Sequence, residues 1–116
     1  MKKLLILITA YNVESFIKKV IKRLPHEELK KEFQYQILIL DDKSIDKTRD
    51  EIKKIKAEFN DLDIKCLFNK VNQGYGGNQK IGYYYAVKLN FDYVVLLHGD
   101  GQYAPEKILD IMEPFK

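Results

Sequence analysis

The chain has 116 residues, of which 46% are hydrophobic and 32% charged. This length and composition fit a single soluble globular domain and exclude a disordered chain. The net charge of +3, from 20 basic and 17 acidic residues, is too small and too scattered to indicate a nucleic-acid-binding protein.

Strand and helix patterns alternate from the start of the chain. Residues 4–9 form a continuous apolar run, which predicts a strand covered on both faces. This run is too short for a membrane span and lacks the small-residue cleavage site of a signal peptide. Apolar residues in 16–24 recur at helical spacing up to Pro25, where a helix should stop, and we expect His26 in a solvent-facing loop. A second strand is predicted at 37–40.

The middle of the chain contains a second helix and a third strand. Apolar residues at positions 52, 55 and 59 mark the helix, which Asp46 or Thr48 caps at its start. Residues 64–68 form the third strand and contain the single cysteine, Cys66. One cysteine allows no internal disulfide and has no metal-ligand spacing around it, so we expect a core residue in a protein from a reducing compartment.

The last part of the chain repeats the pattern after a polar, glycine-containing loop. A helix with an apolar face over 81–89 follows the loop, then a strand at 93–97. The final helix begins near Pro105, which suits a first turn. It is expected to bury the apolar side chains of Ile108, Ile111, Met112 and Phe115.

Strands separated by helices predict right-handed βαβ units. The expected fold is therefore a three-layer α/β/α, Rossmann-like fold with a mostly parallel sheet. In such folds, ligands bind at the carboxyl ends of the strands, near the point where the strand order reverses. We expect the four polar segments after the strands to meet at one edge of the sheet. Their sequences are TAYN, DDKSID, NKVNQGYGG and HGDGQY.

Two adjacent carboxylates, Asp41 and Asp42, follow the second strand. Because like charges repel, we expect a partner to offset them. One interpretation is that Asp42 accepts a hydrogen bond from the base or ribose of a ligand. The other is that one of the pair caps the next turn, together with Ser44 and Asp46. Capping alone does not require two carboxylates, which favours ligand binding by one of them.

His98, Asp100 and Gln102 occupy alternate positions after the fourth strand, so an extended backbone would point their side chains the same way. Carboxylate and amide oxygens suit Mg²⁺ or Mn²⁺, and an imidazole suits Mn²⁺ better. The flanking glycines, Gly99 and Gly101, would let an anionic ligand approach the backbone. The segment is a candidate cation site, and the alternative interpretation is an ordinary turn.

Residues 74–77 form a glycine-containing segment at the start of a helix. Its N–H groups are candidates for phosphate binding, and Lys80 would add positive charge. The segment matches neither the dinucleotide fingerprint nor the P-loop, and taken alone it is a weak indication of a phosphate site.

Taken in order, four segments resemble the family 2 glycosyltransferases with the GT-A fold, including the polyprenyl-phosphate sugar transferases. Residues 8–14 (ITAYNVE) are similar to the family's Pro-Ala-Tyr-Asn-x-Glu signature, with Thr9 in place of proline. Residues 39–48 (ILDDKSIDKT) are similar to its Asp-Asp-x-Ser-x-Asp-x-Thr segment. Residues 72–82 (NQGYGGNQKIG) and 96–108 (LLHGDGQYAPEKI) resemble its glycine loop and its Asp-x-Asp-Gly-Gln segment.

The resemblance implies a nucleotide-sugar site. Asp42 would hold the base, uracil or guanine, while Asp100 and Gln102 would hold a divalent cation, Mn²⁺ or Mg²⁺, on the diphosphate. The implied nucleotide-binding residues are Ala10, Tyr11, Asn12, Glu14, Asp41, Asp42, Gly74, Lys80 and Asp100. His98 replaces the first Asp of Asp-x-Asp. It is a third candidate metal ligand without negative charge, and the alternative is that it only contacts phosphate.

The resemblance also implies what residues 1–116 contain. We expect a single nucleotide-sugar-binding domain, truncated before the acceptor-binding part, with the general base beyond residue 116. Such a fragment is expected to bind nucleotide weakly, to lack transfer activity alone and to associate through its open sheet edge. The implied partners of the whole protein are a nucleotide-diphosphate sugar and a polyprenyl phosphate or glycan acceptor. The expected location is the cytoplasm, with the full-length protein at the cytoplasmic face of a membrane.

Two other functions are alternatives. A phosphorylation-receiver signalling domain has a similar length, a parallel sheet and carboxylates at strand ends. However, it has its acidic pair after the first strand and its phosphoacceptor after the third, whereas this chain has the pair after the second. The other alternative is a noncatalytic domain that keeps a nucleotide-binding cleft.

Overall fold

A parallel sheet of four strands forms the centre of the structure, a computed structural model that describes residues 1–101 and 104–115. The strands are β1 (Lys3–Ala10), β2 (Gln34–Asp41), β3 (Ile64–Phe68) and β4 (Tyr93–His98). They lie in the order β3-β2-β1-β4, and all three neighbouring pairs are parallel. Along the chain, β2 and β3 are added on one side of β1, and β4 is added on its other side, so the strand order reverses at β1. The predicted three-layer fold with a parallel sheet is confirmed.

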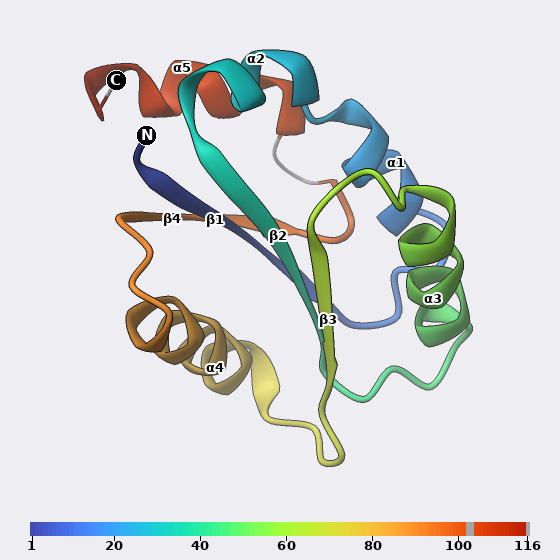
Figure 1. Cartoon of the computed structure of the whole chain (residues 1–116). Helices are drawn as coiled ribbons and strands as arrows, with labels where there is room; N and C mark the ends of the chain where they lie inside the picture. The colour runs from blue at the N-terminus through green and yellow to red at the C-terminus, as the bar shows by residue number, and fades with distance from the viewer. Residues whose placement is uncertain (102–103, 116) are drawn as a thin grey trace.

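Helices cover both faces of the sheet (Figure 1). Helix α4 (Gly74–Lys88) lies on one face. The helices on the other face are α1 (Ile17–Arg23), α2 (His26–Glu32), α3 (Thr48–Glu58) and α5 (Ile108–Met112), the last flanked by the 3₁₀ turns η1 (Pro105–Lys107) and η2 (Glu113–Phe115). No helix within the described residues is long and apolar enough to cross a membrane.

The central strand β1 contributes to two separate hydrophobic clusters. Leu4, Ile6 and Ile8 belong to the larger cluster, under α1, α3 and α5, whereas Leu5 and Leu7 belong to the smaller one, under α4. Because successive side chains of a strand point to opposite faces, both faces of β1 must be apolar. This explains the continuous apolar run in the sequence.

Helix α4 lies unusually close to the sheet at Gly82. A Cβ atom at this position would come within 2.3 Å of Leu7 Cδ2. A larger residue would therefore require the buried Leu7 side chain to move or α4 to shift away from β1.

The prediction for His26 is wrong, because this residue begins α2 and is partly buried. Its Nδ1 lies 2.7 Å from the hydroxyl of Tyr35, and its Nε2 lies 2.8 Å from the carbonyl oxygen of Ile21. Within α2 only Leu29 is buried, so this seven-residue helix has no apolar repeat that sequence analysis would detect.

Three smaller expectations are resolved by the packing. The N-cap position of α3 is Lys47, so the expectation that Asp46 or Thr48 caps the helix is wrong, although the Asp46 carboxylate accepts the Thr48 N–H at 2.9 Å. Cys66 is partly buried on the edge strand β3, where burial raises the pKa of its thiol.

At the chain end Ile108 and Met112 are buried as expected, but Ile111 and Phe115 are mostly exposed. Ile111 lies on the exposed side of α5. The helical path tightens into η2 after Met112, which changes the direction of the Phe115 side chain.

Candidate functional site

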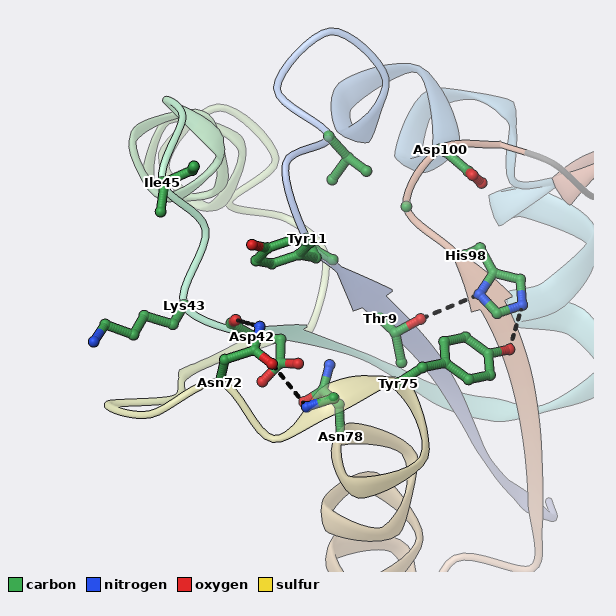
Figure 2. A pocket seen from close by; sticks show the side chains of 14 residues that line it. Thr9, Tyr11, Asp42, Lys43, Ile45, Asn72, Tyr75, Asn78, His98 and Asp100 are labelled. Atoms are coloured by element: carbon green, nitrogen blue, oxygen red, sulfur yellow. Dashed lines mark hydrogen bonds between the residues drawn. The ribbon is translucent and has the colours of Figure 1, made fainter.

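A pocket of about 830 Å³ opens at the carboxyl ends of β1, β2 and β4 (Figure 2). It lies where the strand order reverses, which is the usual ligand position in open α/β sheets. The predicted site residues that line it are Ala10, Tyr11, Asp42, Gly74, His98 and Asp100. The fold thus brings together residues that lie far apart in the sequence.

The adjacent carboxylates Asp41 and Asp42 have different surroundings. Asp41 is fully buried; it accepts the Ser44 N–H at 3.2 Å and pairs with Arg49 Nε at 2.8 Å. Asp42 is also buried, at 4% exposed, but it lines the pocket. Asp41 therefore holds the turn after β2, as the second interpretation expects. Asp42 lines the pocket, and its binding of a ligand stays a prediction.

The carboxylate of Asp42 is held through one of its two oxygens. Its Oδ1 accepts the side-chain amide of Asn69 at 2.9 Å and the backbone N–H of Gln73 at 2.7 Å. The same Asn69 amide reaches Asn78 Oδ1 at 3.0 Å, and Asn78 donates to the carbonyl oxygen of Leu40 at 3.2 Å. Among the described residues, both of these hydrogen bonds go to Oδ1, and none goes to Asp42 Oδ2. We call Asp42, Asn69, Asn72, Gln73 and Asn78 the β2 side of the pocket.

A turn follows β4 directly, in place of the expected extended segment. The Gly101 N–H donates to the His98 carbonyl oxygen at 3.1 Å, and Gly101 has a φ of +71°. The prediction that alternation along an extended backbone would align His98 and Asp100 is therefore wrong. Both residues still line the pocket, because the turn returns Asp100 to it. The predicted ligand Gln102 lies outside the described residues.

Gly99 is buried inside this turn by close packing against β1. A Cβ atom there would lie 3.0 Å from Val13 Cγ2 and 3.1 Å from the Thr9 carbonyl oxygen. The Gly99 N–H also donates to that carbonyl oxygen, at 2.8 Å. The glycine allows the end of β4 to pack against β1, which fixes the position of the turn.

His98 contacts two hydroxyl groups through its ring nitrogens (Figure 2). Its Nδ1 lies 3.3 Å from Thr9 Oγ1, and its Nε2 lies 2.8 Å from the Tyr75 hydroxyl. The rings of Tyr75 and His98 stack with centroids 5.1 Å apart. We call Thr9, Tyr75, His98, Gly99 and Asp100 the β4 side of the pocket. Within the described ranges, no three His, Cys, Asp or Glu side chains are grouped so that they would hold a metal ion.

Three further predicted residues lie outside the pocket lining. Asn12, at a φ of +52°, accepts the Ile45 N–H at 2.9 Å and so joins the loops after β1 and β2. The backbone N–H of Glu14 reaches Asp46 at 3.4 Å, in the same pair of loops. Lys80 is exposed on α4. Asn12 and Glu14 therefore contribute to the shape of the loops around the pocket.

Sequence analysis missed several polar residues at the pocket. The side chain of Asn72 donates to the Asp42 carbonyl oxygen at 2.9 Å and accepts the Gly74 N–H at 2.9 Å. Asn69 and Asn78 orient Asp42, and their only signal in the sequence was an asparagine-rich segment around the glycines. Nothing in the sequence singled out Tyr75, since only the fold brings it to His98.

Two relatives from Methanococcus voltae match the chain. One, named UDP-N-acetylglucosamine--dolichyl-phosphate N-acetylglucosaminyltransferase, is 29% identical over 97% of this chain and 47% of its own length. The other is named dolichyl N-acetyl-alpha-D-glucosaminyl phosphate 3-beta-D-2,3-diacetamido-2,3-dideoxy-beta-D-glucuronosyltransferase; it is 39% identical over 66% of this chain and 24% of its own length. The chain thus spans about half of the first relative and a quarter of the second.

Several solved structures have the same fold. The mannosyltransferase PcManGT from Pyrobaculum calidifontis, in complex with GDP-Man and Mn²⁺, matches with a TM-score of 0.70 and 15% identity over 84% of this chain and 27% of its own. Staphylococcus aureus TarS, in complex with UDP-GlcNAc, matches with a TM-score of 0.67 and 24% identity over 99% of this chain and 31% of its own. The family model described as Glycosyl transferase family 2 matches residues 5–116. Because this match covers nearly the whole sequence, the chain belongs to glycosyl transferase family 2.

Proposed function

We propose that the protein binds a nucleotide-diphosphate sugar in this pocket and transfers the sugar to an acceptor. The observation that carries the proposal is the placement of Asp42 and Asp100, from two different strand ends, in one pocket of about 830 Å³. This volume lies in the range of small-molecule sites. Membership of the family supports the same function and argues against a phosphorylation-receiver domain.

The base of the nucleotide binds on the β2 side. The buried Asp42 carboxylate lines the pocket, and a buried acceptor oxygen recognises an N–H group of a base. The ring of Tyr11, which is 49% exposed, lines the same pocket and offers an apolar face to a planar base.

The nucleotide is a uridine diphosphate. Oδ1 of Asp42 already accepts two hydrogen bonds, from Asn69 and Gln73, so a single oxygen remains for the base. Uracil presents one N–H between its two carbonyl groups, whereas guanine presents two adjacent donors that a carboxylate binds best with both oxygens. The name of the first relative, which includes UDP-N-acetylglucosamine, agrees with this choice.

The diphosphate binds on the β4 side, where the carboxylate of Asp100 lines the pocket. The hard oxygen of Asp100 suits Mn²⁺ or Mg²⁺, and two of the similar structures contain Mn²⁺. When bound, a divalent cation offsets the negative charge that develops on the leaving diphosphate. For the whole protein we propose a polyprenyl-phosphate acceptor, because both Methanococcus voltae relatives are named for dolichyl substrates.

Calorimetric titration of the protein with UDP, GDP and CDP, with and without Mn²⁺, tests the proposal. We expect UDP to bind at least about tenfold more tightly than GDP, which corresponds to about 1.4 kcal/mol. In Asp42→Asn, the amide oxygen would keep the two existing hydrogen bonds, and the amide N–H₂ would face the base. That donor opposes the N–H of uracil but suits the ring nitrogen of cytosine, so preference should move from UDP toward CDP.

The matched control is Asp50→Asn, which removes an exposed carboxylate on α3. It should leave all three affinities unchanged. The proposed function is rejected if wild-type protein binds none of the nucleotides. The proposed orientation of the base is rejected if Asp42→Asn keeps the nucleotide preference of the wild type.

A further inference from the structure

The imidazole of His98 lies between two hydroxyl groups from different elements. Thr9 belongs to the end of β1, and Tyr75 is the second residue of α4. We propose that His98 is a positioning residue, which holds Tyr75 and the first turn of α4 at the β4 side of the pocket, and that it does not bind the divalent cation. The effect on nucleotide binding rests on the proposed function; the contact itself does not.

Both ring nitrogens of His98 are engaged by protein groups. Nδ1 lies 3.3 Å from Thr9 Oγ1, and Nε2 lies 2.8 Å from the Tyr75 hydroxyl. A hydroxyl donates or accepts equally well, so either tautomer of a neutral imidazole is satisfied in this position. A metal bond to either nitrogen would need its lone pair and a reorientation of these contacts. The geometry therefore favours hydrogen bonding by His98 over cation binding.

The first turn of α4 needs such an attachment because its own packing is sparse. Gly74 has a φ of +74°, and a Cβ atom added at Gly74 or Gly76 would meet no atom within 4 Å. Asn72 attaches this turn to the β2 side, through the Gly74 N–H. On the other side, Tyr75 is 59% exposed but stacks on His98 at a centroid distance of 5.1 Å.

The contact also shapes the pocket. Tyr75, His98 and Asp100 all line it, and Figure 2 shows the ring of Tyr75 directed toward His98. With Tyr75 held, the first turn of α4 is ordered before a ligand arrives. Ligand binding then costs less conformational entropy, because the site is already ordered. Loss of the contact should therefore weaken nucleotide binding.

Hydrogen exchange of the protein without nucleotide tests the contact directly. Tyr75→Phe keeps the ring and removes the hydroxyl, and His98→Phe removes both nitrogens. In each, we expect amides 74–78 to exchange about tenfold faster, since the local opening becomes easier. The matched control is Tyr84→Phe, an exposed tyrosine on the same helix, which should exchange like the wild type. Because Tyr75 is exposed, Tyr75→Phe should fold normally. Unchanged exchange of residues 74–78 in both variants would overturn the inference.

Binding of Mn²⁺ in the presence of UDP, followed by electron paramagnetic resonance, tests the second half of the inference. His98→Phe should keep the Mn²⁺ affinity within about threefold at saturating UDP, whereas Asp100→Asn should lower it about 100-fold. A loss in His98→Phe as large as that in Asp100→Asn would overturn the inference. If the wild type binds neither UDP nor Mn²⁺, the proposed function fails, and hydrogen exchange alone decides whether His98 holds Tyr75.

Discussion

The two sides of the pocket hold their carboxylates in different ways. On the β2 side, Asp42 is buried and fixed through Oδ1 by Asn69 and Gln73. On the β4 side, Asp100 is exposed and sits on a turn closed by a backbone hydrogen bond to His98. A buried, oriented oxygen suits one N–H of a neutral base. An exposed carboxylate on a turn suits a cation that keeps some of its water ligands.

The largest expected effect is on the β4 side. Asp100→Asn should weaken UDP binding in the presence of Mn²⁺ about 100-fold, because the amide oxygen carries no charge for the cation. Without Mn²⁺, the variant and the wild type should bind UDP equally. Calorimetry under both conditions measures the difference, with the exposed Asp110→Asn as the control. A similar loss in the absence of Mn²⁺ would show that the two sides do not divide base and cation between them.

A smaller effect is expected on the β2 side. Asn69→Ala removes one donor to Asp42 and the donor to the buried Asn78 oxygen. We expect about tenfold weaker UDP binding and a loss of 1–3 kcal/mol, in order of magnitude, in the free energy of unfolding. Unlike Asp100→Asn, this variant should lose affinity with and without Mn²⁺. Urea unfolding and calorimetry check both values against Asn60→Ala, an exposed control.

Gly99→Ala should act indirectly on the β4 side. Its Cβ would press on Val13 and on the Thr9 carbonyl oxygen, so the end of β4 must move away from β1. We expect about threefold weaker UDP binding in Mn²⁺ and about 1 kcal/mol lower stability. The control Gly76→Ala adds a Cβ in open space and should be neutral or slightly stabilising in thermal unfolding. Equal effects of the two substitutions would contradict the packing argument.

The smallest effect is expected for Arg49→Lys. Arg49 pairs with Asp41 through Nε and donates to the Asn69 carbonyl oxygen through Nη2 at 2.7 Å. A lysine offers one charged group in place of this fork. Because the Arg49 side chain is 37% exposed, solvent screens the pair, and we expect a loss below about 1 kcal/mol in urea unfolding. A larger loss than that of Asn69→Ala would mean that Asp41, and not Asn69, controls the β2 side.

Periodicity and strand-end chemistry predicted most of the framework. The apolar runs located all four strands, and the polar segments after them pointed to the pocket edge. The sequence alone did not explain why Asp42 lines the pocket while Asp41 holds the turn after β2. That depends on the salt bridge of Asp41 with Arg49 and on the amide of Asn69, and both are tertiary contacts.

Contacts between side chains of distant elements could not be predicted from the sequence either. Tyr75 and His98 meet only because α4 crosses from β3 to β4. Helix α2 was not predicted because it buries only one side chain. The turn after β4 was one of two interpretations of its segment, because Gly99 fits both an extended and a turned backbone.

The packing of α4 against β1 has a consequence for how this site tolerates change. Asn78, Gly82 and Ala86 are buried at intervals of four residues, so one narrow stripe of small side chains faces the sheet. Each residue turns an α-helix by about 100°. Inserting a single residue between Asn78 and Gly82 would therefore rotate Asn78 and Tyr75 away from the pocket while every pocket residue stayed in the sequence. The spacing along this helix is as much a part of the site as the side chains that contact a ligand.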